Sequence, residues 1–310
     1  MAKRSYHADP ASLMRIKNLQ LRAQVVVEGF LTGLHRSPYH GFSVEFSEYR
    51  QYSPGDDLRF LDWRLLARTD RYYVKRFEDE TNLRCTLLLD TSSSMQFGSG
   101  EVTKADYART FAATVAQFLT NQRDAVGLLA FDQHLVEYLL PRYRPGHLHR
   151  IMTSLERAPA GTGTDLGVPL DQVARTVKKR GLLILISDFL APLDHLDRQL
   201  GTLRARGHEL IAVRVLDKSE TDFSFEDAAL FEDLESKRQL YINPAAAREK
   251  YLARFNEHAA AVQNVCDRQG IQYVSLTTDQ PLELALFDLL SQRSAGGRRV
   301  RRNARQRGAV

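Results

Sequence analysis

The chain has 310 residues, of which 43% are hydrophobic and 26% are charged. This composition supplies enough apolar residues for a sizeable core and excludes disorder over most of the chain. No run approaches the roughly 20 apolar residues that a membrane-spanning helix needs, and no apolar signal region follows the first residues. We therefore expect a cytoplasmic protein without a transmembrane segment.

The formal net charge of +5 is concentrated at the end of the chain. Segment 294–310 contains no acidic residue, whereas the rest of the chain is close to neutral. The arginines that carry this charge are Arg298, Arg299, Arg301, Arg302, Arg305 and Arg307. Such a charge run is typical of a disordered, solvated tail. Binding of RNA or anionic lipid is the alternative, and we favour the solvated tail.

The amino-terminal part combines a helical pattern with a charged stretch. Apolar residues recur every three or four positions over 12–34 and predict one amphipathic helix, and the alternating run 42–46 predicts a strand. The acidic residues of the charged stretch 48–68 include Asp56, Asp57 and Asp62. Acid–base catalysis is one reading, but we favour turn capping and neutralisation by nearby arginines. Apolar residues around Trp63 predict that this stretch packs onto the rest of the chain.

A short, continuously apolar run at 86–89 is typical of a strand buried on both faces of an α/β sheet. Asp90 follows it at the carboxyl edge, where open α/β sheets bind ligands, and we expect its side chain to face solvent there. Ser92 and Ser94 alternate with Asp90, so three oxygen-bearing side chains can turn toward one point. Oxygen ligands of this kind suit Mg²⁺, Mn²⁺ or Ca²⁺ and suit zinc poorly.

The remainder alternates between helical and strand patterns. Helices are expected over 105–119, 170–177, 193–203, 244–266 and 281–290, and strands over 125–131, 182–186, 209–215 and 271–276. The run 135–140 predicts an edge strand ended by Pro141, and 230–234 is expected to pair with 239–242 as a hairpin. Strands separated by helices call for a mainly parallel sheet.

Cysteine and histidine spacing predicts no site. Cys85 in the central strand and Cys266 on a helix form no C-x-x-C or metal pattern, so we expect reduced core residues. The nine histidines, including His147 and His149, are expected at the surface.

Two later stretches carry further oxygen ligands. Thr164 lies in the glycine-rich loop 161–167, and Asp188 follows the apolar run 182–186. The ordered set Asp90, Ser92, Ser94, Thr164 and Asp188 resembles the metal-ion-dependent adhesion site of von Willebrand factor A domains. The resemblance implies a von Willebrand factor A-like (Rossmann-like) α/β fold with helices on both faces of the sheet. It also implies that the five residues surround one divalent ion, with Asp188 acting through water.

A second resemblance lies upstream. The run G-D-D-L-R-F-L-D-W-R-L-L-A-R at 55–68 resembles the bacterial domain of unknown function family 58, DUF58, and with the metal motif the likeness covers residues 12–292. We expect an amino-terminal helical and strand segment (1–80) packed onto the A-like domain (81–292), followed by the basic tail (293–310). Members of the family are commonly encoded beside MoxR-type AAA+ ATPases, so the resemblance implies such an ATPase as a partner.

Together these features favour a non-enzymatic, metal-dependent protein-binding adaptor. In the adhesion-site mechanism that the resemblance implies, a carboxylate of a partner protein fills one position on the ion. Beside a MoxR-type ATPase, the expected role is chaperone-like maturation or remodelling of a client complex. The alternatives are a hydrolase that uses Asp90 or Asp188 with a divalent metal, and a nucleic-acid binder that uses the arginine tail. The sequence lacks a second Asp-Thr/Ser-Gly, a G-x-S-x-G elbow and a Walker motif, which argues against a hydrolase.

Overall fold

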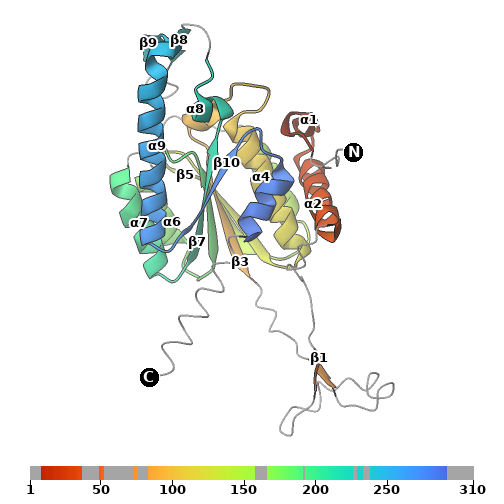
Figure 1. Cartoon of the computed structure of the whole chain (residues 1–310). Coiled ribbons are helices and arrows are strands. Elements are labelled where there is room, and N and C mark those ends of the chain that lie inside the picture. Colours follow the sequence, from red (N-terminus) through yellow and green to blue (C-terminus); the bar gives the residue numbers. More distant parts are fainter. Residues whose placement is uncertain are drawn as a thin grey trace. The chain divides into compact units, whose positions relative to one another are not determined.

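The computed structural model describes residues 8–36, 49–51, 73–75, 83–157, 166–190, 193–225, 229–232 and 238–291 (Figure 1). The chain divides into two compact units, residues 34–82 and the remainder. In the smaller unit, β1 (Tyr49–Gln51) pairs with β2 (Tyr73–Lys75) in antiparallel orientation. The expected domain boundaries at 80 and 292 stay predictions. The expected strand 42–46, the acidic residues Asp56, Asp57 and Asp62, the Trp63 anchor, Thr164 and the tail lie outside the described residues.

The larger unit is built on a six-stranded sheet in the order β10-β7-β6-β3-β4-β5. Its strands are β3 (Arg84–Asp90), β4 (Ala125–Phe131), β5 (Leu135–Arg142), β6 (Leu182–Ser187), β7 (Glu209–Leu216) and β10 (Gln272–Thr277). All neighbours are parallel except β4 and β5. The predicted mainly parallel α/β sheet is confirmed, with the apolar run before Asp90 near its centre.

The edge strand β5 departs from the prediction at Pro141, which lies inside the strand and does not end it. An edge position tolerates proline because no further strand needs its missing N–H. The neighbouring strand adapts through Gly127, where an added Cβ would lie only 2.6 Å from the Leu139 carbonyl oxygen and 2.7 Å from the Pro141 nitrogen. The register shift between Val126 and Leu128 falls at this close approach.

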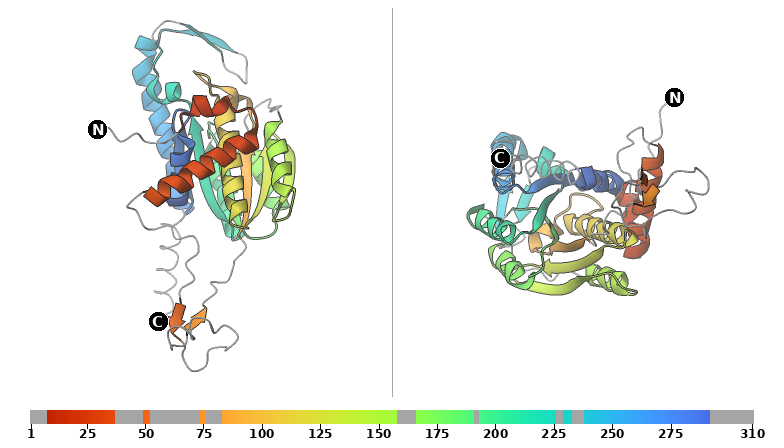
Figure 2. Two further views of the ribbon diagram at one scale, coloured as in Figure 1. Left: turned by 90° about the vertical axis from the view of Figure 1, so that its right-hand side faces the viewer. Right: turned by 90° about the horizontal axis from the view of Figure 1, so that it is seen from below.

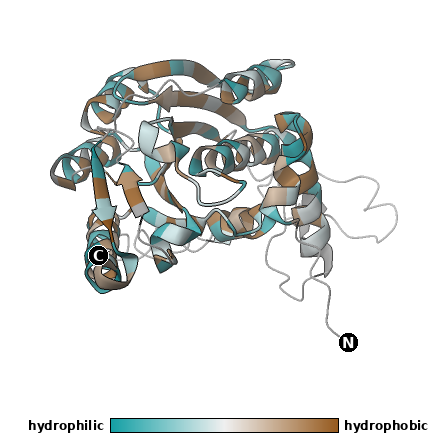
Figure 3. Ribbon diagram, turned by 90° about the horizontal axis from the view of Figure 1, so that it is seen from above, coloured by the Kyte–Doolittle hydropathy of each residue, from teal (hydrophilic) through white to brown (hydrophobic). Residues whose placement is uncertain are grey.

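Helices cover both faces of the sheet, as predicted (Figure 2). One face carries α6 (Gly167–Thr176), α7 (Leu193–Ala205) and α9 (Pro244–Arg268), whose apolar side chains pack with those of β3, β6 and β7 in one core cluster. The other face carries α4 (Lys104–Asn121) and the closing helix 282–291, with α5 (His147–Glu156) against α4. In Figure 3 the strands are mostly hydrophobic, whereas the helices alternate, as expected for elements with one buried face.

The amino-terminal segment 12–34 forms two helices, so the prediction of one continuous helix is wrong. α1 (Pro10–Met14) ends at Arg15, and α2 (Leu19–Arg36) begins after Asn18, whose side-chain oxygen accepts a hydrogen bond from the Leu21 N–H (2.8 Å). This asparagine cap offers a start signal inside the apolar periodicity. α2 packs on α4, because Phe30 meets Phe118 edge-to-face with a centroid separation of 5.7 Å.

A small substructure projects beyond the carboxyl edge of the sheet. It consists of α8 (Lys218–Asp222), the hairpin of β8 (Ala229–Glu232) and β9 (Gln239–Ile242), and the first turns of α9 (Figure 1). The predicted hairpin is confirmed. Cys85 and Cys266 are buried and free, also as predicted. Of the helices that the structure describes, none is both long and apolar enough to span a membrane.

Candidate metal centre

Asp90 is the last residue of β3 and is only 2% exposed. Its Oδ1 accepts a hydrogen bond from the Ser92 N–H (2.9 Å), and its Oδ2 accepts one from the Ser187 hydroxyl (2.6 Å). The expectation that Asp90 faces solvent is therefore wrong. Leu89 pairs with Ile186 across the parallel strands, so the next residue of β6, Ser187, lies beside the carboxylate.

This buried carboxylate carries a shifted pKa. Burial, and then repulsion by the Asp188 carboxylate, raise the pKa of Asp90 to about 6, against the opposing effect of hydrogen bonds from Ser187 and Ser92. The site thus disfavours a second negative charge at Asp90. A cation beside it would favour the charged form.

Ser92 lies on the turn that leads from β3 into the short 3-10 helix η2 (Ser93–Gln96), and Ser94 lies within this helix. Ser92 is fully buried, and its Oγ is 3.1 Å from the Ser94 Oγ. Thr91 fixes the turn, since its N–H and its hydroxyl both donate to the Phe131 carbonyl oxygen of β4 (2.8 and 2.9 Å). The structure therefore brings the oxygens of Asp90, Ser92 and Ser94 together at the end of the central strand.

Asp188 follows β6 directly and is fully buried. Its Oδ2 accepts a hydrogen bond from Lys104 Nζ (2.9 Å), and its Oδ1 accepts one from the Leu190 N–H (3.2 Å). Its backbone carbonyl oxygen accepts a third from Arg214 Nε (3.0 Å). Both carboxylate oxygens are thus already engaged, and Asp188 is tied into the fold beside Asp90.

The partner of Asp188 is a fully buried lysine at the start of α4. Lys104 Nζ also donates to Glu220 Oε1 of α8 (2.8 Å). Burial by itself would lower the pKa of this ammonium, but Asp188 and Glu220 outweigh burial and raise the pKa above its ordinary value. Lys104 therefore remains a cation at neutral pH, within the carboxylate cluster.

Sequence reasoning missed both Lys104 and Glu220. The local signals exist, because Thr103 caps α4 and Asp217 forms a capping box with Glu220 at the start of α8. These signals mark helix starts. They do not show that Lys104 and Glu220, at two helix starts far apart in the chain, form an ion pair beside Asp188, which only the tertiary structure reveals.

Another buried charged residue at this edge was also missed. Asp217, after β7, accepts hydrogen bonds from the hydroxyls of Ser99 (2.5 Å), Ser219 (2.7 Å) and Thr278 (3.1 Å). Although burial by itself would raise the pKa of Asp217, the hydrogen bonds from Ser99 and Ser219 lower it. Asp217 thus links the loop after η2, the start of α8 and the residue after β10 by hydrogen bonds. Its position after a strand, like that of Asp90 and Asp188, was a usable signal.

The residues present fit a hard cation in part. One carboxylate and two hydroxyls are the oxygen ligands that Mg²⁺ accepts, and Asp90, Ser92 and Ser94 supply them together. Within the described part of the chain, no three His, Cys, Asp or Glu residues gather as a metal-binding group, so an ion here would depend on the hydroxyls. Asp188, held by Lys104, suits contact through water better than direct ligation.

A model of one protein family matches residues 48–261, and its description is "Protein of unknown function DUF58". The chain belongs to this family. The DUF58 chain is 30% identical over 293 residues to uncharacterized proteins of Mycobacterium tuberculosis and Mycobacterium bovis, covering 93% of its own length and 92% of theirs. The names of these relatives indicate no enzymatic activity.

Solved structures similar to this DUF58 chain include BatB from Bacteroides thetaiotaomicron, with a TM-score of 0.45, 13% identity, and coverage of 70% of this chain and 99% of that one. Another is a von Willebrand factor type A protein from Catenulispora acidiphila, with a TM-score of 0.34, 14% identity, and coverage of 56% and 42%.

Proposed function

We propose that this DUF58 protein is a non-enzymatic adaptor that binds a partner protein through a Mg²⁺-type ion. The observation that carries the proposal is the convergence of the Asp90, Ser92 and Ser94 oxygens at the carboxyl end of the central strand, the edge where open α/β sheets bind ligands. Family membership and the α/β fold suggest a protein-interaction domain and support the same direction.

In this proposal Asp90, Ser92 and Ser94 hold the ion, with Thr164 as a further ligand and Asp188 acting through water. The ion, when bound, supplies a positive centre that accepts a carboxylate oxygen from the partner. The residues of the chain do the rest. Ser187 and the Ser92 N–H orient Asp90, and Lys104 fixes Asp188 and compensates its charge.

The second half of the proposal concerns the partner. The likeness of the 55–68 run and the metal motif to proteins encoded beside MoxR-type AAA+ ATPases supports such an ATPase, or a client that it remodels, as the protein that approaches this edge. The role would then be chaperone-like maturation or remodelling of a client complex.

Metal binding is tested by titrating the full chain with Mn²⁺, followed by electron paramagnetic resonance, and by competition with Mg²⁺. We expect weak, exchangeable binding that Asp90→Asn abolishes and Ser94→Ala weakens. Asp267→Asn is the matched control, since it removes an exposed carboxylate from the last turn of α9. Absence of divalent binding at millimolar concentration, or stoichiometric zinc in the purified protein, would refute the metal proposal.

The partner is tested by co-purification of tagged protein with the MoxR-type ATPase of the same organism, in Mg²⁺ and again in EDTA. Capture that depends on Mg²⁺ and on Asp90 supports the adaptor role. Capture of the ATPase by the Asp90→Asn variant, folded and at the level of the unaltered protein, would show that the metal site is not the binding surface.

A further inference from the structure

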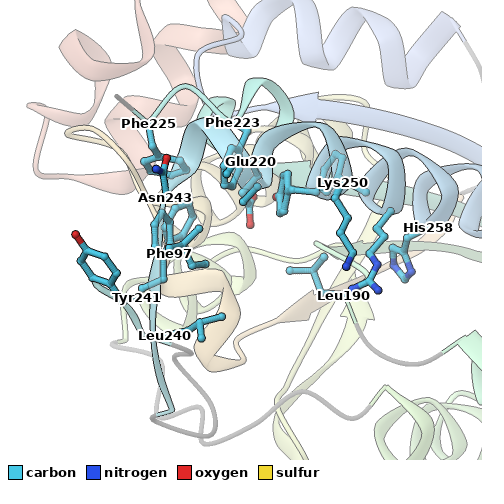
Figure 4. Close-up of a pocket in the computed structure, with 17 residues that line it drawn as sticks. Phe97, Leu190, Glu220, Phe223, Phe225, Leu240, Tyr241, Asn243, Lys250 and His258 are labelled. Atoms are coloured by element: carbon cyan, nitrogen blue, oxygen red, sulfur yellow. The ribbon is translucent and has the colours of Figure 1, made fainter. Parts of the chain in front are cut away.

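A groove of about 860 Å³ lies beside the metal site, between α9, the β8–β9 hairpin and the loops that follow η2 and β6 (Figure 4). Its aromatic lining includes Phe97, Phe223, Phe225, Phe231, Tyr251 and Phe255. Phe97 directly follows η2, and Leu190 lies two residues after Asp188. The groove thus borders the loops that carry the metal-site residues but is built from different side chains.

The aromatic side chains of the groove already pack on one another. Phe223 lies against Tyr251 with ring centroids 4.4 Å apart, and Phe225 meets Phe231 edge-to-face at 5.1 Å. Such packing fixes the rings before a ligand arrives, which lowers the entropy lost on binding. At the rim, Leu240 and Tyr241 of β9 are 64% and 71% exposed. Exposed apolar residues beside a formed apolar groove are typical of an interaction site.

The α9 wall adds positive charge. Lys250 and Arg254 lie one turn apart on α9 and are exposed, and His258 follows on the next turn. Figure 4 shows Lys250 and His258 toward the Leu190 end of the groove, away from Phe225 and Tyr241. Among the described residues, neither Lys250 nor Arg254 has a carboxylate within ion-pair distance.

The acidic residue of the groove does not cancel this charge. Glu220 Oε1 accepts the hydrogen bond from buried Lys104 (2.8 Å), and its Oε2 accepts one from the Asp217 N–H (2.8 Å). Its negative charge is therefore already compensated inside the fold. Within the described part of the chain, the groove consequently presents an apolar surface with a basic side that no carboxylate compensates.

A buried guanidinium adds to the positive potential. Arg214 of β7 is fully buried beneath Phe255, with its guanidinium carbon 5.1 Å from the ring centroid. Its Nε donates to the Asp188 carbonyl oxygen, whereas its two terminal nitrogens have no hydrogen-bond partner in the described part of the chain. A buried cation that has no carboxylate partner among the described residues favours anions nearby.

We propose that this groove, defined by α9 and the β8–β9 hairpin, binds an acidic amphipathic segment of a partner protein. Apolar side chains of the segment would lie on the aromatic cluster, and its carboxylates would pair with Lys250 and Arg254. We choose an acidic peptide as the ligand because of charge complementarity. Lys250 and Arg254 on α9 repel the chain's own arginine tail and attract an acidic peptide. This inference deepens the proposed adaptor function but uses atoms outside the metal site, so the two can fail separately.

The test begins with selection of a random peptide library on the immobilised full chain. We expect the enriched peptides to combine Asp or Glu with aromatic or aliphatic residues. The best peptide, labelled with fluorescein, is then measured by fluorescence anisotropy. Lys250→Glu with Arg254→Glu should weaken its binding about tenfold or more. The control is Lys178→Glu with Lys179→Glu, an equal charge change at exposed residues before β6, which should leave binding unchanged.

EDTA and Asp90→Asn separate the two proposals, because neither should affect peptide binding in the groove. Enrichment of basic peptides, or equal binding by the groove variant, would overturn the inference. Binding that requires the ion and ignores Lys250 and Arg254 would also overturn it, and would support the metal site instead. If phosphatidylglycerol vesicles bind through the same two residues and no peptide does, the groove is a membrane contact and the peptide proposal is wrong.

Discussion

The central strand and the groove contain similar side chains that differ in solvent exposure and in charge pairing. In β3, Leu87 and Leu88 have no exposed surface, whereas Leu240 and Tyr241 of the hairpin are mostly exposed. Charge follows the same division, since Lys104 is bound by two carboxylates while Lys250 has none among the described residues. β3 and the Lys104 ion pairs therefore stabilise the fold through completed contacts, whereas the groove leaves apolar and charged side chains available for a ligand.

Breaking the completed charge cluster should have the largest effect. Lys104→Met removes the ammonium and leaves Asp188 and Glu220 buried without a counter-ion. We expect a loss of about 3–5 kcal/mol in the free energy of unfolding, measured by urea denaturation. Lys250→Met is the matched change in the groove and should alter stability by less than about 0.5 kcal/mol. Equal stability of the two variants would contradict the division between the regions.

Truncation of the apolar core comes next. Leu88→Ala deletes a side chain with no exposed surface from the middle of β3 and should cost about 2–5 kcal/mol through lost burial and a cavity. The same urea experiment measures it. A loss below about 1 kcal/mol would mean that the sheet collapses around the deletion, and that the centre is less rigid than the packing indicates.

The accuracy of the sequence-based predictions also differs between parts of the molecule. Continuous apolar runs identified β3 and β6, because a strand buried on both faces needs no polar alternation. The same periodicity joined α1 and α2 into one helix, since apolar spacing continues across the break that Asn18 caps. His147, expected at the surface, is buried on α5 with Nε2 2.9 Å from the Val126 carbonyl oxygen.

At the candidate site, local spacing placed the Asp90, Ser92 and Ser94 oxygens near one another, because residues two apart on one turn share a direction. It did not predict the burial of Asp90, which depends on Ser187 from another strand. Lys104 and Arg214 were missed for the same reason. Their contacts are with elements distant in the sequence. The local sequence around a lysine at the start of a helix does not indicate which carboxylate it will contact.

His147, which begins α5 and contacts β4, predicts a pH effect of intermediate size. Burial, with nearby arginines, lowers the pKa of His147 despite its hydrogen bond to Val126. A histidine pKa below its unfolded value of about 6.5 contributes stability that is complete above that pH and is lost as pH falls through the folded-state pKa. Asp90, whose raised pKa acts with the opposite sign in the same pH range, is common to the unaltered protein and to His147→Gln. We therefore expect acidification below about pH 6.5 to lower the melting temperature of the unaltered protein relative to that of His147→Gln. His208, whose pKa is lowered likewise, should retain part of the effect.

The smallest effect on stability is expected in the hairpin, where it is the most informative. Leu240→Ser and Tyr241→Ser change side chains that are mostly exposed, so each should shift the unfolding free energy by less than about 0.5 kcal/mol. Both variants should nevertheless weaken binding of the acidic peptide, because each removes an apolar side chain at the edge of the groove that the peptide would cover. Anisotropy and urea denaturation on the same preparations measure the two quantities. A destabilised hairpin variant would show that these side chains already serve the fold, and unchanged peptide binding would place the ligand elsewhere in the groove.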